Sequence, residues 1–174
     1  MNATSDESRY QQSLTYQSYL KVNELLSLQQ LKSAEPDGVG EHDEMLFIII
    51  HQTYELWFKQ LLHELDAVCR SLSAGDTYES LGLLGRIRTI IKICVAQVDI
   101  LETMTPTQFL SFRERLESAS GFQSAQFRLV EAVLGRRSTS MLSQFHPESQ
   151  EHERLAARLR QPSLWDACLR YFNH

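Results

Sequence analysis

Residues 41–58, EHDEMLFIIIHQTYELWF, decide the fold. Their apolar side chains recur every three or four positions, which is the spacing of one face of an α-helix. This stripe continues past the quoted stretch and comprises Leu46, Ile50, Tyr54, Trp57, Leu61, Leu65 and Val68. A second stripe lies beside it and comprises Phe47, His51, Glu55, Phe58 and Leu62. We therefore predict a helix from near Glu41 to about Leu72 that contacts neighbours on more than one side.

The sequence on either side of this helix is also helical in pattern, and residues 33–40 have the Gly and Pro content of a loop. Helices are expected within residues 14–31, from about Tyr78 to Met104, from a Thr105 cap to about Leu116, from a break at 118–121 to about Leu134, and from Leu164 to Phe172. The sequence shows no strand alternation, hairpin signal or internal repeat. We expect an all-α helical bundle.

Three end signals support these helix boundaries. Thr105-Pro106-Thr107-Gln108 has the form of a capping box with Pro at the first helical position. Gly135 stands where a helix would stop, and Ser163 can cap the last helix. We expect residues 1–12 to form a flexible polar arm and residues 13–174 to form a single all-helical domain.

Composition excludes several classes of partner. The net charge of −5 and the absence of a basic run argue against nucleic acid. The longest apolar window, residues 45–54, is about half of what a membrane-spanning helix needs.

Cys69, Cys94 and Cys168 are scattered without CxxC spacing, so we expect reduced, buried thiols in a cytoplasmic protein, with a catalytic thiol as the less favoured alternative.

Two residues are candidates for chemistry. His51 lies on an apolar helix face. It is either a core histidine that hydrogen-bonds to one neighbour, or a base and hydrogen-bond partner in a pocket, and its spacing alone favours the core histidine. Arg113 either forms a surface or interhelical salt bridge or offers a bidentate fork to a carboxylate. Without other information the salt bridge is favoured. His152 lies in a charged stretch that we expect to be exposed, and no set of residues has the spacing of a metal site.

Longer strings of sequence change this balance, because together they closely resemble the tryptophan 2,3-dioxygenase family. They are LTYxxYLKV at 14–22, EHDEMLFIIIHQ at 41–52, ELWFK at 55–59, LETMTP at 101–106, FR at 112–113, ASGFQS at 119–124, LG at 134–135, PSL at 162–164 and LRY at 169–171. The resemblance runs in order from about residue 13 to near the end of the chain. It implies the all-helical fold of that haem-dependent family.

The resemblance also implies an activity and roles for residues. Members of the family bind haem b and insert both atoms of O₂ across the indole C2–C3 bond of L-tryptophan, giving N-formylkynurenine in the kynurenine pathway of tryptophan catabolism. By resemblance, His51 is the catalytic-site residue that hydrogen-bonds the indole N–H. Phe47 packs on the indole ring and borders the haem, Phe109 lies along the same wall, and Arg113 clamps the substrate carboxylate.

Two further groups of residues acquire roles in the same way. Ser120 and Gly121 are expected over the haem. Tyr16, Tyr19 and Leu20 match a segment that reaches into a neighbouring subunit's pocket in the family's homotetramer, so we expect a homo-oligomer.

One departure from the family limits these expectations. Family members continue into helices that carry the proximal haem histidine and a glycine-rich loop over the substrate amino group, and neither is matched here. Since His146, His152 and His174 do not match the ligand position, we expect a C-terminally truncated, incomplete haem dioxygenase domain that retains haem poorly. Whether this chain is itself an enzyme is therefore open. The alternatives are a non-catalytic binding or assembly module and a variant that acts on a related aromatic amino acid.

Overall fold

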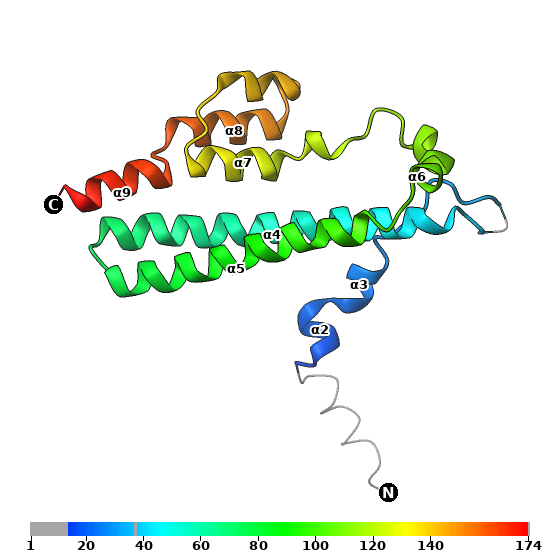
Figure 1. The fold of residues 1–174 in the computed structure, drawn as a ribbon, viewed down its shortest axis with the longest axis horizontal. Coiled ribbons are helices and arrows are strands. Elements are labelled where there is room, and N and C mark those ends of the chain that lie inside the picture. The colour runs from blue at the N-terminus through cyan, green and yellow to red at the C-terminus, as the bar shows by residue number, and fades with distance from the viewer. Residues whose placement is uncertain (1–13, 37, 174) are drawn as a thin grey trace, which may run out of the picture.

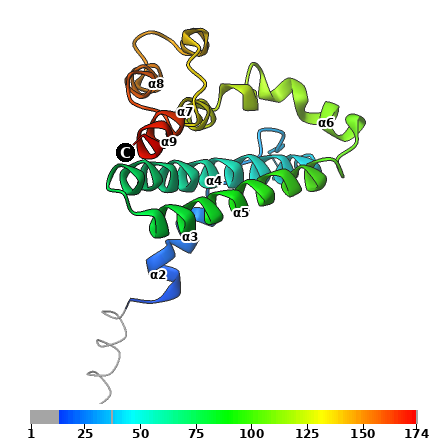
Figure 2. The same cartoon turned by 60° about the vertical axis from the view of Figure 1, so that its left-hand side comes forward.

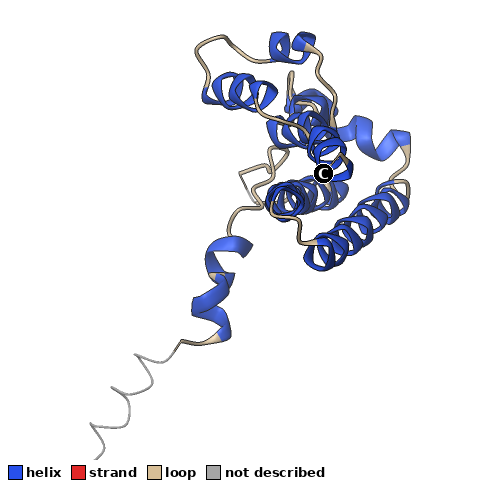
Figure 3. Ribbon diagram, turned by 90° about the vertical axis from the view of Figure 1, so that its left-hand side faces the viewer, coloured by secondary structure: helices blue, strands red, loops and turns tan. Residues whose placement is uncertain are grey.

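Two long antiparallel helices form the centre of the molecule. The computed structural model describes residues 14–36 and 38–173, and within them α4 (His42–Ser73) lies beside α5 (Thr77–Leu101) along the long axis (Figure 1). Every regular element of the described residues is a helix (Figure 3). The all-α prediction is confirmed, and the predicted bounds of the central helix agree with α4 to within about one residue.

The remaining helices lie on two sides of this pair (Figure 2). One side carries α6 (Pro106–Arg113), α7 (Ala125–Leu134), α8 (Gln150–Arg160) and α9 (Leu164–Phe172). Short 3-10 turns at Glu114–Leu116, Gly121–Gln123 and Thr139–Gln144 connect them. On the opposite side, α2 (Tyr16–Leu20) and α3 (Val22–Leu26) project away from the body.

The main core fills the space where α4 meets α5, α7 and α9. Leu65 and Val68 of α4 are 1% and 0% exposed, and Val133 of α7 is 1% exposed. Burying each such side chain contributes about 1.5–3 kcal/mol, so this contact fixes α7 and α9 on α4. It thereby fixes where the loop before α7 lies relative to α4.

A second core cluster joins α7 to α8, a helix that the sequence reasoning missed. Leu155 of α8 is fully buried and packs with Leu129, Ala132 and Met141. Glu151, Glu153 and Arg154 are exposed, as expected of the stretch around His152, but the segment is an amphipathic helix and His152 itself is half-buried. Its single buried leucine gave too weak a periodic signal among ten mostly charged and polar neighbours.

The predicted end signals are confirmed. The Thr105 hydroxyl accepts a hydrogen bond from the amide of Gln108, and the Gln108 side chain accepts one from the Thr105 amide. Ser163 makes the same reciprocal pair with Asp166. Gly135 ends α7 at φ 114°, a left-handed conformation that other residues adopt only with strain.

The helix expected within residues 14–31 is split in two. Lys21 adopts φ 51°, a left-handed backbone that separates α2 from α3, and in the described part of residues 27–41 no regular helix follows before α4. The loop after them is tied down by the buried carboxylate of Glu44, which accepts hydrogen bonds from the amides of Lys32 and Ser33 and from the Ser33 hydroxyl. The expected arm at residues 1–12 lies outside the described residues, and the single-domain boundary stays a prediction.

The three cysteines are free, but they are half-buried rather than buried as expected. Each packs at the margin of the main core instead of inside it. Among the helices of the described residues, none combines the length and the apolar character needed to cross a membrane.

Candidate functional site

His51 is held in one tautomer by its own helix. Its Nδ1 lies 2.7 Å from the carbonyl oxygen of Phe47, one turn earlier in α4, and the two rings lie with centroids 4.1 Å apart. A carbonyl oxygen can only accept, so Nδ1 carries the hydrogen and donates it. In the neutral imidazole Nε2 is then a bare acceptor, ready to receive an N–H from a ligand.

Gly121 keeps this acceptor accessible. A Cβ placed on Gly121 would lie 3.5 Å from His51 Nε2 and 3.6 Å from Cδ2, so the backbone of this glycine passes directly by the imidazole edge. The turn is set by Ser120, whose side chain accepts from the amide of Phe122 and whose own amide donates to Gln123. Ser120 and Gly121 are thus brought to His51 from a segment about seventy residues later in the chain.

His51 opens onto adjoining cavities of about 370 and 330 Å³, and onto a third of about 350 Å³ on the side of α3. The largest is lined by His51, Tyr54, Glu55, Phe58, Ser120, Gly121, Phe122, Ser124 and Phe127. Tyr54 and Phe58 of α4 and Phe127 of α7 contribute aromatic rings to its wall, and Phe58 and Phe127 lie with centroids 5.3 Å apart. A concave surface with several aromatic rings and a few hydrogen-bonding groups, among them His51 Nε2, suits a flat, partly polar ligand.

A second aromatic group extends the wall toward α6. Phe47, Phe109 and Phe112 form a triangle with ring centroids 5.6–5.7 Å apart. Phe112 is fully buried and anchors α6 on α4, whereas Phe47 and Phe109 are half-buried. The predicted neighbours Phe47 and Phe109 are therefore in contact, and Phe47 lines one of the His51 cavities.

Arg113 follows Phe112 at the end of α6 and does not have the salt bridge that spacing alone favoured. Its guanidinium donates to the carbonyl oxygen of Glu117 at 2.9 Å, and within the described residues it has no carboxylate partner. Glu117 itself has φ 50°, so this bond closes a tight turn. Arg113 lines none of the three His51 cavities, and its role as a carboxylate clamp stays a prediction.

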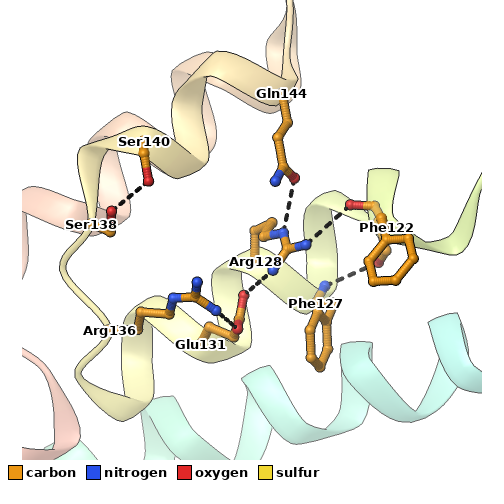
Figure 4. Close-up of polar contacts among 9 residues, drawn as sticks. Phe122, Phe127, Arg128, Glu131, Arg136, Ser138, Ser140 and Gln144 are labelled. Atoms are coloured by element: carbon orange, nitrogen blue, oxygen red, sulfur yellow. Dashed lines mark hydrogen bonds and ion pairs between the residues drawn. The ribbon is translucent and has the colours of Figure 1, made fainter.

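A buried arginine supports the cavity from behind (Figure 4). Arg128 of α7 donates to the carbonyl oxygen of Phe122, to Gln144 and to Glu131, and its guanidinium lies 5.5 Å from the Phe127 ring centroid. Its side chain is 9% exposed. It therefore links two lining residues, Phe122 and Phe127, to the 3-10 turn before α8.

Sequence reasoning left Glu55 without a role, although it lies in the same stripe one turn after His51. Glu55 lines all three cavities that His51 lines. Gln126 of α7 donates to the Glu55 carboxylate at 2.8 Å and to its carbonyl oxygen at 2.9 Å, so the side chain is fixed. The stripe Phe47, His51, Glu55 and Phe58 was the signal that could have found it.

The other residues expected at the site lie elsewhere. Tyr16 and Tyr19 are 73% and 69% exposed on α2, Leu20 is 45% exposed, and none of them lines the His51 cavities. Over the described part of the chain, no three His, Cys, Asp or Glu side chains gather as a metal site would require.

The sequence of the chain is similar to proteins of a known family. Residues 1–174 match the family model described as tryptophan 2,3-dioxygenase. The tryptophan 2,3-dioxygenase of Herpetosiphon aurantiacus is 57% identical over 160 residues, which are 92% of this chain. The chain belongs to the tryptophan 2,3-dioxygenase family.

Other family members give the same result. The tryptophan 2,3-dioxygenase of Anaeromyxobacter sp. strain K is 52% identical over 96% of the chain, and that of Dictyostelium discoideum is 50% identical over 78% of it. The chain spans 60% of the length of the Herpetosiphon protein, 61% of the Anaeromyxobacter protein and 35% of the Dictyostelium protein. The resemblance stated from the sequence strings is therefore confirmed at the level of the family.

Proposed function

We propose that this chain forms the substrate-binding wall of a haem-dependent tryptophan 2,3-dioxygenase, which opens the indole ring of L-tryptophan to N-formylkynurenine. One observation carries the proposal: His51 donates Nδ1–H to its own helix and presents Nε2 as an acceptor beside Gly121. The indole N–H is a donor without acceptor capacity, so it matches this nitrogen. Family membership supports the same reaction.

The residues present fit one face of a haem b. The cavity beside His51 has flat aromatic walls from Tyr54, Phe58 and Phe127, and the missing side chain at Gly121 leaves room over the imidazole edge. We place the haem against Ser120 and Gly121 with Phe47 at its border. Haem b supplies the redox chemistry by which O₂ reacts with the indole ring.

The protein side chains have separate tasks toward the substrate. Phe47 and Phe109 provide ring faces on which an indole can stack, and Phe112 behind them fixes their positions. His51 accepts the indole N–H and so orients the ring. Arg113, which has no carboxylate partner within the described residues, is available to pair with the amino-acid carboxylate in a bidentate contact.

We further propose that the chain assembles with copies of itself and works in the cytoplasm. The exposed Tyr16, Tyr19 and Leu20 on a projecting segment are suited to enter a neighbouring subunit's pocket. Large apolar side chains are also exposed along α5, among them Ile93, Val95, Val98 and Ile100. Three free thiols accord with a reducing compartment.

The test is product formation by the protein expressed from its complete reading frame and supplied with hemin, L-tryptophan and O₂. We expect N-formylkynurenine, identified by mass spectrometry, with free hemin and with L-phenylalanine as controls. No product above the free-hemin control would contradict the proposal. If the protein also fails to take up hemin and instead co-purifies with a longer family member, the non-catalytic assembly role replaces it.

A further inference from the structure

A second concave region lies far along α4 from His51, at the end of that helix where α8 and α9 meet it. Two cavities of about 680 and 530 Å³ share Gln161, Pro162 and Arg170 in their walls. Their charged lining residues are Asp66, Arg70, Arg137, Arg158, Arg160, Asp166 and Arg170. Five arginines against two aspartates make this region strongly positive in a chain whose net charge is −5.

The two aspartates leave most of the positive charge unpaired. Arg158 pairs with Asp66 at 2.9 Å, and Arg137 pairs with Asp166 at 2.9 Å. Throughout the described residues, Arg70, Arg160 and Arg170 have no carboxylate within ion-pair distance. The three free guanidiniums come from different helices, α4, α8 and α9: Arg70 lines one cavity, Arg160 lines the other, and Arg170 lines both.

The lining also retains hydrogen-bonding capacity. Arg158 donates from its terminal nitrogen to Asp66 and Gln161, yet its buried Nε–H has no partner within the described residues. Cys69 adds no negative charge here, because burial raises the pKa of its thiol and keeps it protonated. The walls of these two cavities therefore offer a ligand mainly hydrogen-bond donors and positive charges, with few acceptors.

We propose that this region, here called the arginine cleft, binds a compact multivalent oxyanion carrying phosphoryl or carboxylate groups. The guanidinium fork matches both groups bidentately and is weakly hydrated, so several arginines that line adjoining cavities favour such groups. The cavity volumes fall in the range of small-molecule sites. A concave site of this size on an acidic chain does not suit nucleic acid, which needs an extended basic surface.

An anion bound in the arginine cleft would also stabilise the fold. Its walls belong to α4, α8 and α9 together, and α4 carries His51. An anion that bridges these helices binds only the folded state and so raises its stability by mass action. This effect is independent of haem and of tryptophan.

Isothermal titration calorimetry with inorganic pyrophosphate and with citrate tests the proposal, in low and in high sodium chloride. We expect saturable one-site binding that weakens with salt, accompanied by a rise in melting temperature. Binding of pyrophosphate alone assigns the site to phosphoryl groups, and binding of citrate alone assigns it to carboxylates. Saturable binding of neither anion overturns the proposal.

Three variants locate the site. Arg170→Gln and Arg160→Gln remove exposed guanidiniums without carboxylate partners, so both proteins should fold, and each should weaken binding by about tenfold or more. Arg88→Gln on α5 removes the same charge from a residue that lines neither cavity, and it should leave binding within about twofold. Equal weakening in Arg88→Gln would show a general charge effect and overturn the assignment to the cleft.

Discussion

The Nδ1 of His51 and the carbonyl oxygen of Phe47 lie 2.7 Å apart on consecutive turns of α4. This bond decides which ring nitrogen carries the hydrogen, because a carbonyl oxygen cannot donate. It leaves Nε2 as the acceptor on the side of Gly121 and the aromatic cavity. The helix therefore sets both the orientation of the imidazole and its chemical role.

Gly121→Ala should block this acceptor while leaving the fold intact. The new Cβ would lie 3.5 Å from Nε2, an ordinary contact distance that fills the space a ligand atom needs. Gly121 does not have a positive φ, so Ala is allowed there, and we expect stability to change by less than about 1 kcal/mol. L-Tryptophan affinity, measured by calorimetry on the hemin-supplied protein, should fall by about tenfold or more.

The matched control is Gly82→Ala in α5, where an added Cβ meets none of the described residues within 4 Å. It should leave tryptophan affinity unchanged and stabilise the helix by about 0.5–1 kcal/mol. Undiminished affinity in Gly121→Ala would place the ligand away from Nε2.

Arg113→Ala should weaken binding of L-tryptophan far more than binding of indole. Only the amino acid carries the carboxylate that the guanidinium would pair with, and a hydrogen bond to a charged group contributes about 1.5–3 kcal/mol. The ratio of the two dissociation constants, measured by calorimetry for variant and wild type, isolates this contact. Loss of the bond to Glu117 affects both ligands alike and cancels in the ratio.

Arg115→Ala is the control for that ratio, because Arg115 is exposed, pairs with Glu35 at 3.4 Å and lines none of the three His51 cavities. It should leave both affinities unchanged. An equal loss of indole and tryptophan binding in Arg113→Ala would refute the carboxylate clamp.

Stability should fall in acid through Glu44. Burial alone would raise its pKa, but hydrogen bonds from the Ser33 hydroxyl and from the amides of Lys32 and Ser33 outweigh burial and hold the pKa below 4.5. Because this pKa is lower in the folded state, the ionised Glu44 carboxylate stabilises the fold fully at pH values above 4.5. The stabilisation is lost as the pH falls through the folded-state pKa.

Urea unfolding of Glu44→Gln should therefore show a loss of about 2–3 kcal/mol near neutral pH that shrinks in acid. The amide presents an N–H₂ where the carboxylate accepted hydrogen bonds, so the loop at residues 32–33 is left with an unpaired donor. Glu102→Gln, at an exposed position, should match wild type at every pH. A stability difference independent of pH would contradict the account.

Arg128→Met should destabilise the protein by about 3 kcal/mol, because it removes a buried guanidinium that three partners share (Figure 4). Glu131 keeps its second partner, Arg136, which limits the loss. Chemical denaturation measures the effect, with Arg154→Met on an exposed part of α8 as the control. If the two variants lower the free energy of unfolding equally, the hydrogen bonds of Arg128 to Phe122, Gln144 and Glu131 do not support the fold.

Much of the fold could be predicted because the long helices carry periodic stripes and explicit end signals. The stripe from Leu46 to Val68 predicted α4, and the Thr105 and Ser163 caps predicted the starts of α6 and α9. The break at Lys21 could not be predicted, because a left-handed lysine has no local signal such as the glycine at 135 provides.

The site could be predicted in part. His51, Phe47 and Phe109 were named and are in contact, directly or through one another. Glu55, Phe58 and Phe127 were missed as lining residues, because which side of a two-faced helix borders a cavity depends on where α7 packs. The arginine cleft was beyond prediction for the same reason: its residues come from four segments and meet only in the folded chain.

The most direct test compares the affinity of the hemin-supplied protein for L-tryptophan and for N1-methyl-L-tryptophan, in wild type and in His51→Phe. Wild type should prefer the unmethylated ligand by about tenfold or more, since methylation removes the N–H that Nε2 accepts and leaves that nitrogen unpaired. His51→Phe keeps an aromatic ring but has no acceptor, so the preference should disappear. A preference that persists in His51→Phe would contradict the assignment of His51 as the acceptor of the indole N–H.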